Sequence, residues 1–259
     1  MEGREQERER LRAQRQAAES QDAAADLARK RRIQYLSLAA FAAVALIVAL
    51  IVISQSGGNG SSAPPANVKG ASEAAAEVSG IPQSGTTLGT AGAPVTVIEY
   101  GDPQCSSCRA FSEQVAPQLI SAEVRPGNAK YEFRPYLIIG PDSKPAMRAA
   151  LAAGDQGRFW QFLQLFYLNQ GGENSGYVTD TFLTSIAKGA NVPDIGKWNT
   201  DRNDAKWDAV IQQGSSQAQS FGFSGTPSIV VQGPKGQKPI GGSTIPTLQQ
   251  VQAAIQQVG

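Results

Sequence analysis

The stretch from residue 33 to residue 53, IQYLSLAAFAAVALIVALIVI, carries no charge and limits what the chain can fold into more than any other feature. As a helix, its 21 residues would rise about 31 Å, which matches a hydrocarbon core of roughly 30 Å. A buried core helix and a cleaved signal are the alternatives, but long core helices usually have a polar face, and the apolar region of a signal is shorter. We therefore expect one transmembrane helix over residues 33–53.

Basic residues are distributed unequally about this expected helix. The cluster RKRR at 29–32 comes directly before it, whereas the first basic residue after it is Lys69. The positive-inside rule then places the N-terminus in the cytoplasm. We expect a single-pass protein of the cell membrane, whose remaining residues lie in an extracytoplasmic space where disulfides form and persist.

Three further segments are distinguished by composition. Residues 1–32 are rich in Arg, Glu, Gln and Ala, which predicts a solvated, charged cytoplasmic tail. Residues 54–80 are rich in Gly, Ser, Ala and Pro, which predicts a flexible linker. Residues 81–259 are enough for one folded domain. With 23 Lys and Arg against 22 Asp and Glu, the net charge is +1, so no nucleic-acid partner is expected.

The pattern of apolar residues in 81–259 alternates between strands and helices. Strands are expected over 95–100, 130–136, 228–231 and 237–240, with a turn at 233–236. Helices are expected from residue 105, with a kink at Pro117, over 145–168, 179–187 and 203–220, and at the C-terminus after a cap at Ser243 or Thr244. This order predicts an α/β fold around a small mixed sheet.

The sequence has no histidine and only two cysteines, so most of the catalytic and metal-binding sites that use these residue types are excluded. Catalysis by Ser-His-Asp or Cys-His, His-ligated metals, four-thiolate zinc and disulfide-dense scaffolds are all excluded. The two cysteines form the motif Cys105-Ser106-Ser107-Cys108, whose spacing places two sulfurs one helical turn apart. This spacing permits a reversible disulfide.

A cysteine at a helix N-terminus has a depressed pKa, because the helix dipole and unpaired N–H groups favour its thiolate. Cys105 is therefore the expected exposed, attacking sulfur, and Cys108, shielded one turn further on, is the expected resolving sulfur. A static disulfide is one alternative, although a loop this short stabilises little. A zinc site is another, but it would need an uncommon ligand set of two thiolates with Asp or Glu.

The segments VTVIEYGDPQCSSCRAF and FGFSGTPSIVV resemble the DsbA-like disulfide oxidoreductases of the thioredoxin superfamily. The resemblance covers about residues 81–259 and implies a thioredoxin-like α/β core with a helical insertion, here preceded by a single transmembrane helix. In that family a cis-proline loop faces the redox pair, and Thr226-Pro227 matches it. An X-Pro bond adopts the cis form at low cost, although Pro227 alone also fits a residue at the start of a strand.

The same resemblance assigns two charged residues. A buried acid six positions before the first cysteine corresponds to Glu99, and its paired lysine on the next strand corresponds to Lys130. Glu99 lies in an apolar strand, where a carboxylate is costly unless it is paired or useful, so a role as proton acceptor for Cys108 is expected. The alternative is a solvent-facing residue at a sheet edge. Ser106-Ser107 departs from the Pro-His common in the family, so no imidazolium assists the thiolate.

These features predict a membrane-tethered thiol-disulfide oxidoreductase, most simply an oxidase that passes the Cys105–Cys108 disulfide to exported thiol-containing proteins. The resemblance implies reoxidation by a quinone-linked membrane protein, with no metal and no cofactor besides the redox-active disulfide. Two alternatives stay open: a disulfide reductase or isomerase, for example in cytochrome c maturation, and a non-catalytic binding module on a stalk with a structural disulfide.

Overall fold

The computed structural model describes residues 68–241 and 244–259, which belong to one compact unit. The expected cytoplasmic tail, the expected transmembrane helix over 33–53 and the linker as far as residue 67 lie outside the described residues. Within the ranges that are described, no helix is both long enough and apolar enough to cross a membrane.

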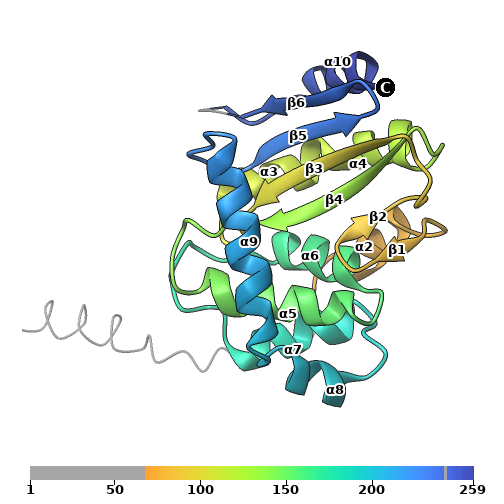
Figure 1. Ribbon diagram of the computed structural model, residues 1–259. Coiled ribbons are helices and arrows are strands. Elements are labelled where there is room, and N and C mark those ends of the chain that lie inside the picture. Colours follow the sequence, from red (N-terminus) through yellow and green to blue (C-terminus); the bar gives the residue numbers. More distant parts are fainter. Residues whose placement is uncertain (1–67, 242–243) are drawn as a thin grey trace, which may run out of the picture. The chain divides into compact units, whose positions relative to one another are not determined.

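One mixed sheet forms the centre of the domain, with strand order β1-β2-β4-β3-β5-β6 (Figure 1). β3 pairs with β4 in parallel and with β5 antiparallel, and the other neighbours are also antiparallel. The sheet confirms the mixed α/β prediction. Each of the four predicted strands begins and ends within two residues of its predicted bounds. Its strands are β1 (Gln83–Ser84), β2 (Thr87–Leu88), β3 (Val95–Gly101), β4 (Ala129–Pro135), β5 (Ser228–Gly233) and β6 (Gly236–Ile240).

β3 is the most buried strand of the sheet, because neighbours cover both of its edges and helices cover both faces. Glu99 pairs in register with Phe133 of β4 on one side and with Ile229 of β5 on the other. Only 3% of the surface of Glu99 is exposed. The alternative of a solvent-facing residue at a sheet edge is therefore wrong, and the predicted burial of this carboxyl is confirmed.

The first helix after β3 is interrupted where the sequence predicts a kink. α3 ends at Gln114, α4 begins at Ala116, and Pro117 lacks the N–H that a continuous helix would use. In the view of Figure 1, these helices lie behind the sheet and α9 crosses in front of it. The helices that cover the sheet are α3 (Ser106–Gln114), α4 (Ala116–Leu119), the π-helical turn η1 (Ile120–Val124), α9 (Lys206–Ser220) and α10 (Leu248–Val258).

Between β4 and α9 the chain forms the helical insertion. The stretch 145–168, predicted as one helix, is two helices, because the chain turns between Gly154 and Arg158. Gly157 has φ +69° in this turn, a conformation that glycine adopts without steric cost. A helix that the sequence analysis did not predict, α8, follows later. The helices of the insertion are α5 (Ser143–Gly154), α6 (Phe159–Leu168), α7 (Asp180–Gly189) and α8 (Ile195–Asp201).

The folded domain begins earlier than Ile81. The predicted flexible linker over 54–80 contains a helix, α2 (Ala71–Glu77), which packs against α6. Ala74 and Val78 are buried in the core, and the guanidinium of Arg125 donates to the carbonyl oxygens of Glu77 and Ser79 at 2.8 and 2.9 Å. Buried apolar side chains and satisfied carbonyls hold residues 68–80 on the domain.

The last helix also begins later than predicted. Thr247 caps α10 through a capping box, in which Thr247 Oγ1 accepts from Gln250 N–H and the Gln250 side chain accepts from Thr247 N–H. Thr244 is three residues too early to serve as the cap, and Ser243 lies outside the described residues. The reciprocal pair with Gln250 explains why the threonine after Pro246 is the one that starts the helix.

Candidate redox site

Cys105 immediately precedes α3 and caps that helix with its sulfur. Its backbone is extended, with φ −70° and ψ 121°, and Sγ accepts a hydrogen bond from the backbone N–H of Cys108 at 3.4 Å. The N–H groups of the first turn have no partner within the helix and present the positive end of the helix dipole to this sulfur. A negative charge on Cys105 is therefore stabilised by the helix. Cys105 and Cys108 are both free thiols.

The surroundings of Cys105 favour its ionised form. A hydrogen bond from Cys108 is the largest cause that lowers the pKa of Cys105, and it exceeds the opposing effect of burial. The side chain of Thr226 and the backbone N–H groups of Cys108 and Ser107 lower it further, to about 6. The expectation that Cys105 is exposed is wrong: only 5% of its surface is exposed, because the loop at Thr226 and the side chain of Gln170 contact it.

Cys108 has the opposite environment. It lies on the inner face of α3 and is fully buried, which raises its pKa well above its ordinary value. Neighbouring charge on Cys105 and Glu99 raises the pKa of Cys108 further. Cys108 therefore remains a thiol at a pH where Cys105 is largely a thiolate, and this difference separates the two sulfurs more than their exposure does.

Alkylation with a small reagent is expected to modify Cys105 alone at mildly acidic pH, because only a thiolate reacts at a useful rate. The rate should follow a single ionisation with a midpoint at about pH 6, the pKa of Cys105. Mass spectrometry of iodoacetamide-treated protein at a series of pH values measures it, with Cys105→Ser as the unlabelled control. Equal labelling of Cys105 and Cys108 would contradict the assignment of their roles.

The Thr226-Pro227 loop faces the redox pair, as predicted. The peptide bond between Thr226 and Pro227 is cis. The thiol of Cys105 donates to the carbonyl oxygen of Thr226 at 3.3 Å, across 121 residues of sequence. β5 begins directly after this loop, at Ser228, so the central sheet positions the loop over the N-terminus of α3.

Glu99 lies in the interior, near the buried sulfur. Its Oε2 accepts a hydrogen bond from the hydroxyl of Tyr131, while its Oε1 has no hydrogen-bond partner among the described residues. Burial raises the pKa of Glu99 to about 8, the hydrogen bond from Tyr131 opposes this rise, and the charge of Cys105 adds to it. Glu99 is therefore mostly protonated at neutral pH, with an ionised fraction that can accept a proton.

Lys130 does not pair with Glu99, so that expectation is wrong. Its ammonium donates to the carbonyl oxygen of Ala91 at 3.1 Å, and in the sheet it pairs in register with Thr96. Side chains alternate between the two faces of a strand, so Lys130 and Tyr131 point in opposite directions. Tyr131 therefore takes the position beside Glu99 that the family resemblance assigned to the lysine.

Two acidic residues that the sequence analysis did not single out shape the loop around Cys105. Asp102 is fully buried; one carboxylate oxygen accepts from Gln104 N–H, and the other from the N–H groups of Ile138 and Ile139 at 2.9 and 3.0 Å. Glu173 accepts from Ser106 N–H at the start of α3. The position of Asp102 directly after β3, before Pro103, was the available signal, since Asp commonly organises such turns.

An open groove of about 570 Å³ lies beside the redox motif. One wall is the outward face of the first two turns of α3, and the other is the loop after α6. The groove includes Ser106, the residue next to Cys105 in the sequence. Its lining residues are Ser106, Arg109, Ala110, Glu113, Gln170, Gly171, Gly172 and Glu173.

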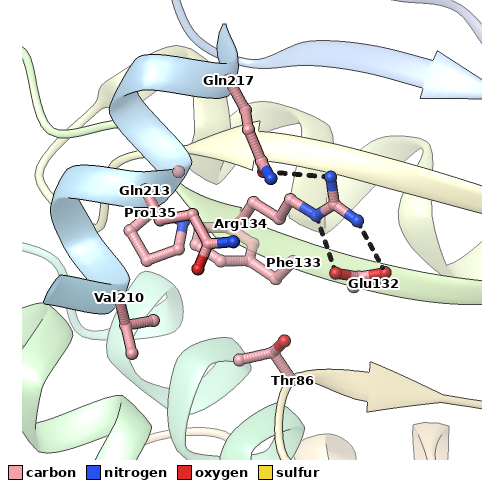
Figure 2. Close-up of a pocket in the computed structure, with 9 residues that line it drawn as sticks. Thr86, Glu132, Phe133, Arg134, Pro135, Val210, Gln213 and Gln217 are labelled. Atoms are coloured by element: carbon pink, nitrogen blue, oxygen red, sulfur yellow. Dashed lines mark hydrogen bonds and ion pairs between the residues drawn. The ribbon is translucent and has the colours of Figure 1, made fainter. Parts of the chain in front are cut away.

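A second cavity, of about 160 Å³, lies between β4 and α9. Figure 2 shows Arg134 between Glu132 and Gln217, and its guanidinium donates to both side chains. The hydroxyl of Tyr100 accepts from the same guanidinium at 3.2 Å. The positive charge of Arg134 in this cavity is therefore paired with the carboxylate of Glu132. Within 68–241 and 244–259, no three His, Cys, Asp or Glu side chains are grouped so as to hold a metal ion.

Comparison with known proteins agrees with this geometry. The family model described as Thioredoxin matches residues 83–256, which is more than half of the chain. The chain belongs to the thioredoxin family. Within that family, a probable disulfide bond formation protein D from Bacillus cereus is 30% identical over 151 residues, which span 57% of this chain and 69% of the relative.

Two solved structures have a similar fold. A thioredoxin-like oxidoreductase from Silicibacter pomeroyi is 29% identical, with a TM-score of 0.55 over 68% of this chain and 91% of the other. Oxidised BdbD from Bacillus subtilis, at 23% identity, has a TM-score of 0.59 over 66% of this chain and 91% of the other. Together with the geometry of Cys105 and Cys108, these relatives identify the chain as a protein thiol-disulfide oxidoreductase.

Proposed function

We propose that this oxidoreductase is an oxidase, which passes a Cys105–Cys108 disulfide to exported polypeptides. The observation that carries the proposal is the position of Cys105 at the N-terminus of α3, where its sulfur accepts from Cys108 N–H and its pKa is lowered to about 6, beside a fully buried Cys108. A stabilised Cys105 thiolate makes the reduced enzyme favourable, and the corresponding disulfide is then a stronger oxidant. A low pKa also makes Cys105 a good leaving group when the oxidised product is released.

The oxidation step moves two electrons from substrate to enzyme. A substrate thiolate attacks Sγ of Cys105, the Cys105–Cys108 bond breaks, and Cys108 leaves with the electron pair and takes a proton. A second substrate thiolate attacks the substrate sulfur of the mixed disulfide, and Cys105 leaves as a thiolate. The open groove beside Ser106 is our candidate for the surface that holds the polypeptide, and the Thr226-Pro227 loop lies beside the reacting sulfur.

Reoxidation returns the two electrons to a partner, for which we propose a quinone-linked membrane protein with its own disulfide. The thiolate of Cys105 attacks one sulfur of that disulfide, whose S–S bond breaks, and the other partner sulfur leaves as a thiolate. Cys108 then gives its proton to the carboxylate of Glu99. The Cys108 thiolate then attacks Cys105 Sγ, which forms the enzyme disulfide and releases the partner thiolate. A carboxyl with a pKa of about 8 donates a proton to Cys108 in one half of the cycle and accepts it in the other. No further cofactor is needed.

The extracytoplasmic location is part of the proposal and is supported by the sequence. The uncharged residues 33–53, preceded by the basic cluster at 29–32, suit a single membrane anchor with the N-terminus in the cytoplasm. A thiol oxidase is useful in an extracytoplasmic space, because cytosolic reductants keep thiols reduced. An anchor would also keep the enzyme close to a membrane-bound partner.

The reduction potential of the Cys105–Cys108 couple tests the proposed direction. It is measured by equilibration with glutathione at pH 7, approached from both the oxidised and the reduced enzyme. A value above about −180 mV is expected for an oxidase. A value near about −270 mV would assign a reductase instead, and one below about −300 mV would indicate a structural disulfide.

A further inference from the structure

A small cavity lined by both polar and apolar side chains lies inside the domain, between the sheet and the helices α2, α3 and α6. Its volume is about 10 Å³. A single buried water needs roughly 10–15 Å³ and two or more polar partners, so the space and its lining suit one water molecule. The polar and titratable side chains on the wall come from five different elements: Glu77, Glu99, Ser112, Tyr131, Gln164 and Tyr167.

Glu99 lies at the inner end of this cavity. Its Oε1 is buried and has no hydrogen-bond partner in the described part of the chain, an arrangement that normally costs about 1–3 kcal/mol. The other oxygen is already bonded to the hydroxyl of Tyr131. An orphaned carboxyl oxygen on the wall of a cavity large enough for one water indicates that the water is its partner.

Glu77 lies at the outer end of the same cavity. It lies in the last turn of α2, is half-buried, and accepts a hydrogen bond from the side-chain amide of Gln164 at 2.8 Å. The oxygen of that amide accepts from the hydroxyl of Ser112 at 2.6 Å. Gln164 therefore has both ends of its amide engaged and holds the Glu77 carboxyl at the cavity, where it has access to both the interior and solvent.

We propose that Glu77 is the relay through which the buried Glu99 carboxyl exchanges protons with solvent. The inference rests on the proposed role of Glu99 as proton acceptor for Cys108, and it extends that role to a residue on α2. When Cys108 releases its proton, Glu99 takes it; the proton then passes through the cavity water to the Glu77 carboxylate and on to solvent. The same path runs in reverse when Cys108 is reprotonated.

The other titratable groups around the cavity cannot replace Glu77. Burial raises the pKa of both Tyr131 and Tyr167 well above the usual value for tyrosine, so neither hydroxyl ionises near neutral pH. Burial raises the pKa of Glu77 to about 7, within one unit of the value of about 8 for Glu99. Nearly matched acids exchange a proton with little loss of free energy in either direction.

The test is the rate of resolution of a Cys105 mixed disulfide, followed by stopped flow between about pH 5 and pH 9 in the full chain. Glu77→Gln keeps the shape and the hydrogen bond but holds no exchangeable charge. It is expected to slow resolution roughly tenfold, below the ~10²-fold typical of a direct acid-base group, and to remove an inflection near pH 7. The initial attack by Cys105 should be unchanged. Glu73→Gln, exposed on the same helix, is the matched control and should behave as the parent protein.

Two further variants make every outcome decisive. If Glu77→Gln does not fold, Glu77→Asp replaces it, since a shorter side chain withdraws the carboxyl from the cavity; slower resolution than in Glu73→Asp supports the relay. Equal rates for the Glu77 and Glu73 variants at every pH overturn it. Glu99→Gln, measured in parallel, separates two failures: slow resolution there alone overturns only the relay, whereas normal resolution in both overturns the role of Glu99 as well.

Discussion

Replacement of Cys108 by serine is expected to abolish turnover and to leave the enzyme covalently attached to the molecule whose disulfide Cys105 attacks. Cys105 keeps its position at the start of α3, and a serine hydroxyl at 108 retains a hydrogen-bond donor toward the Cys105 thiolate. The thiolate therefore still attacks a disulfide substrate. The mixed disulfide then persists, because a serine hydroxyl does not ionise near neutral pH and cannot resolve it.

Electrophoresis and mass spectrometry under non-reducing conditions measure this adduct, which dithiothreitol should release. Cys105→Ser is the matched variant and should form no adduct, since Cys108 is fully buried and its pKa is raised. An adduct on Cys105→Ser but not on Cys108→Ser would show that the two sulfurs have the opposite roles.

Replacement of Glu99 by glutamine is expected to slow the resolution of a Cys105 mixed disulfide by about 100-fold, the lower end of the effect of a general base. Glutamine keeps the size of the side chain and can still accept from Tyr131, but it cannot take the proton of Cys108. The initial attack by Cys105 should change much less. Stopped-flow measurement of the two steps is expected to show accumulation of the mixed disulfide.

A carboxylate on the neighbouring strand provides the control for Glu99→Gln. Glu132 pairs in register with Ile98 and bonds to Arg134 in the cavity beside α9, on the other face of the sheet from Tyr131. Glu132→Gln should leave both steps unchanged. Normal resolution in a folded Glu99→Gln protein would mean that the buried carboxyl does not act as the base.

The sequence predicted the parts of the site that depend on local pattern. The helix start at Cys105 follows from the Gly-Asp-Pro turn after an apolar strand, and the burial of Glu99 follows from its apolar neighbours in β3. These two features need only a strand, a turn and a helix in order, and such patterns are readable from neighbouring residues. The loop at Pro227 was instead expected from the family resemblance, because the local pattern also fitted a residue at the start of a strand.

The remaining features depend on which elements meet in space. Lys130 and Tyr131 are adjacent in sequence, and only the register of β4 against β3 shows that the tyrosine is the one that reaches Glu99. α2 was not predicted, because the Gly-, Ser-, Ala- and Pro-rich composition of residues 54–80 indicated a flexible linker. The buried residues Ala74 in α2 and Val78 and Ile81 after it nevertheless recur at a spacing of three or four, which a prediction from composition does not use.

The burial of Glu99 also makes the stability of the domain depend on pH. Its pKa rises from an ordinary 4.5 to about 8 on folding, so between these values the folded protein holds a proton that the unfolded chain has released. This contribution to stability is complete below about pH 4.5 and is lost as the pH rises through 8. Cys105, whose pKa falls from 9.0 to about 6, has the opposite sign: its thiolate stabilises the fold at high pH, and the gain is lost as the pH falls through 6. Only the reduced enzyme possesses that thiolate. In the enzyme that carries the disulfide, the loss of stability from Glu99 at high pH is therefore not offset by a Cys105 thiolate.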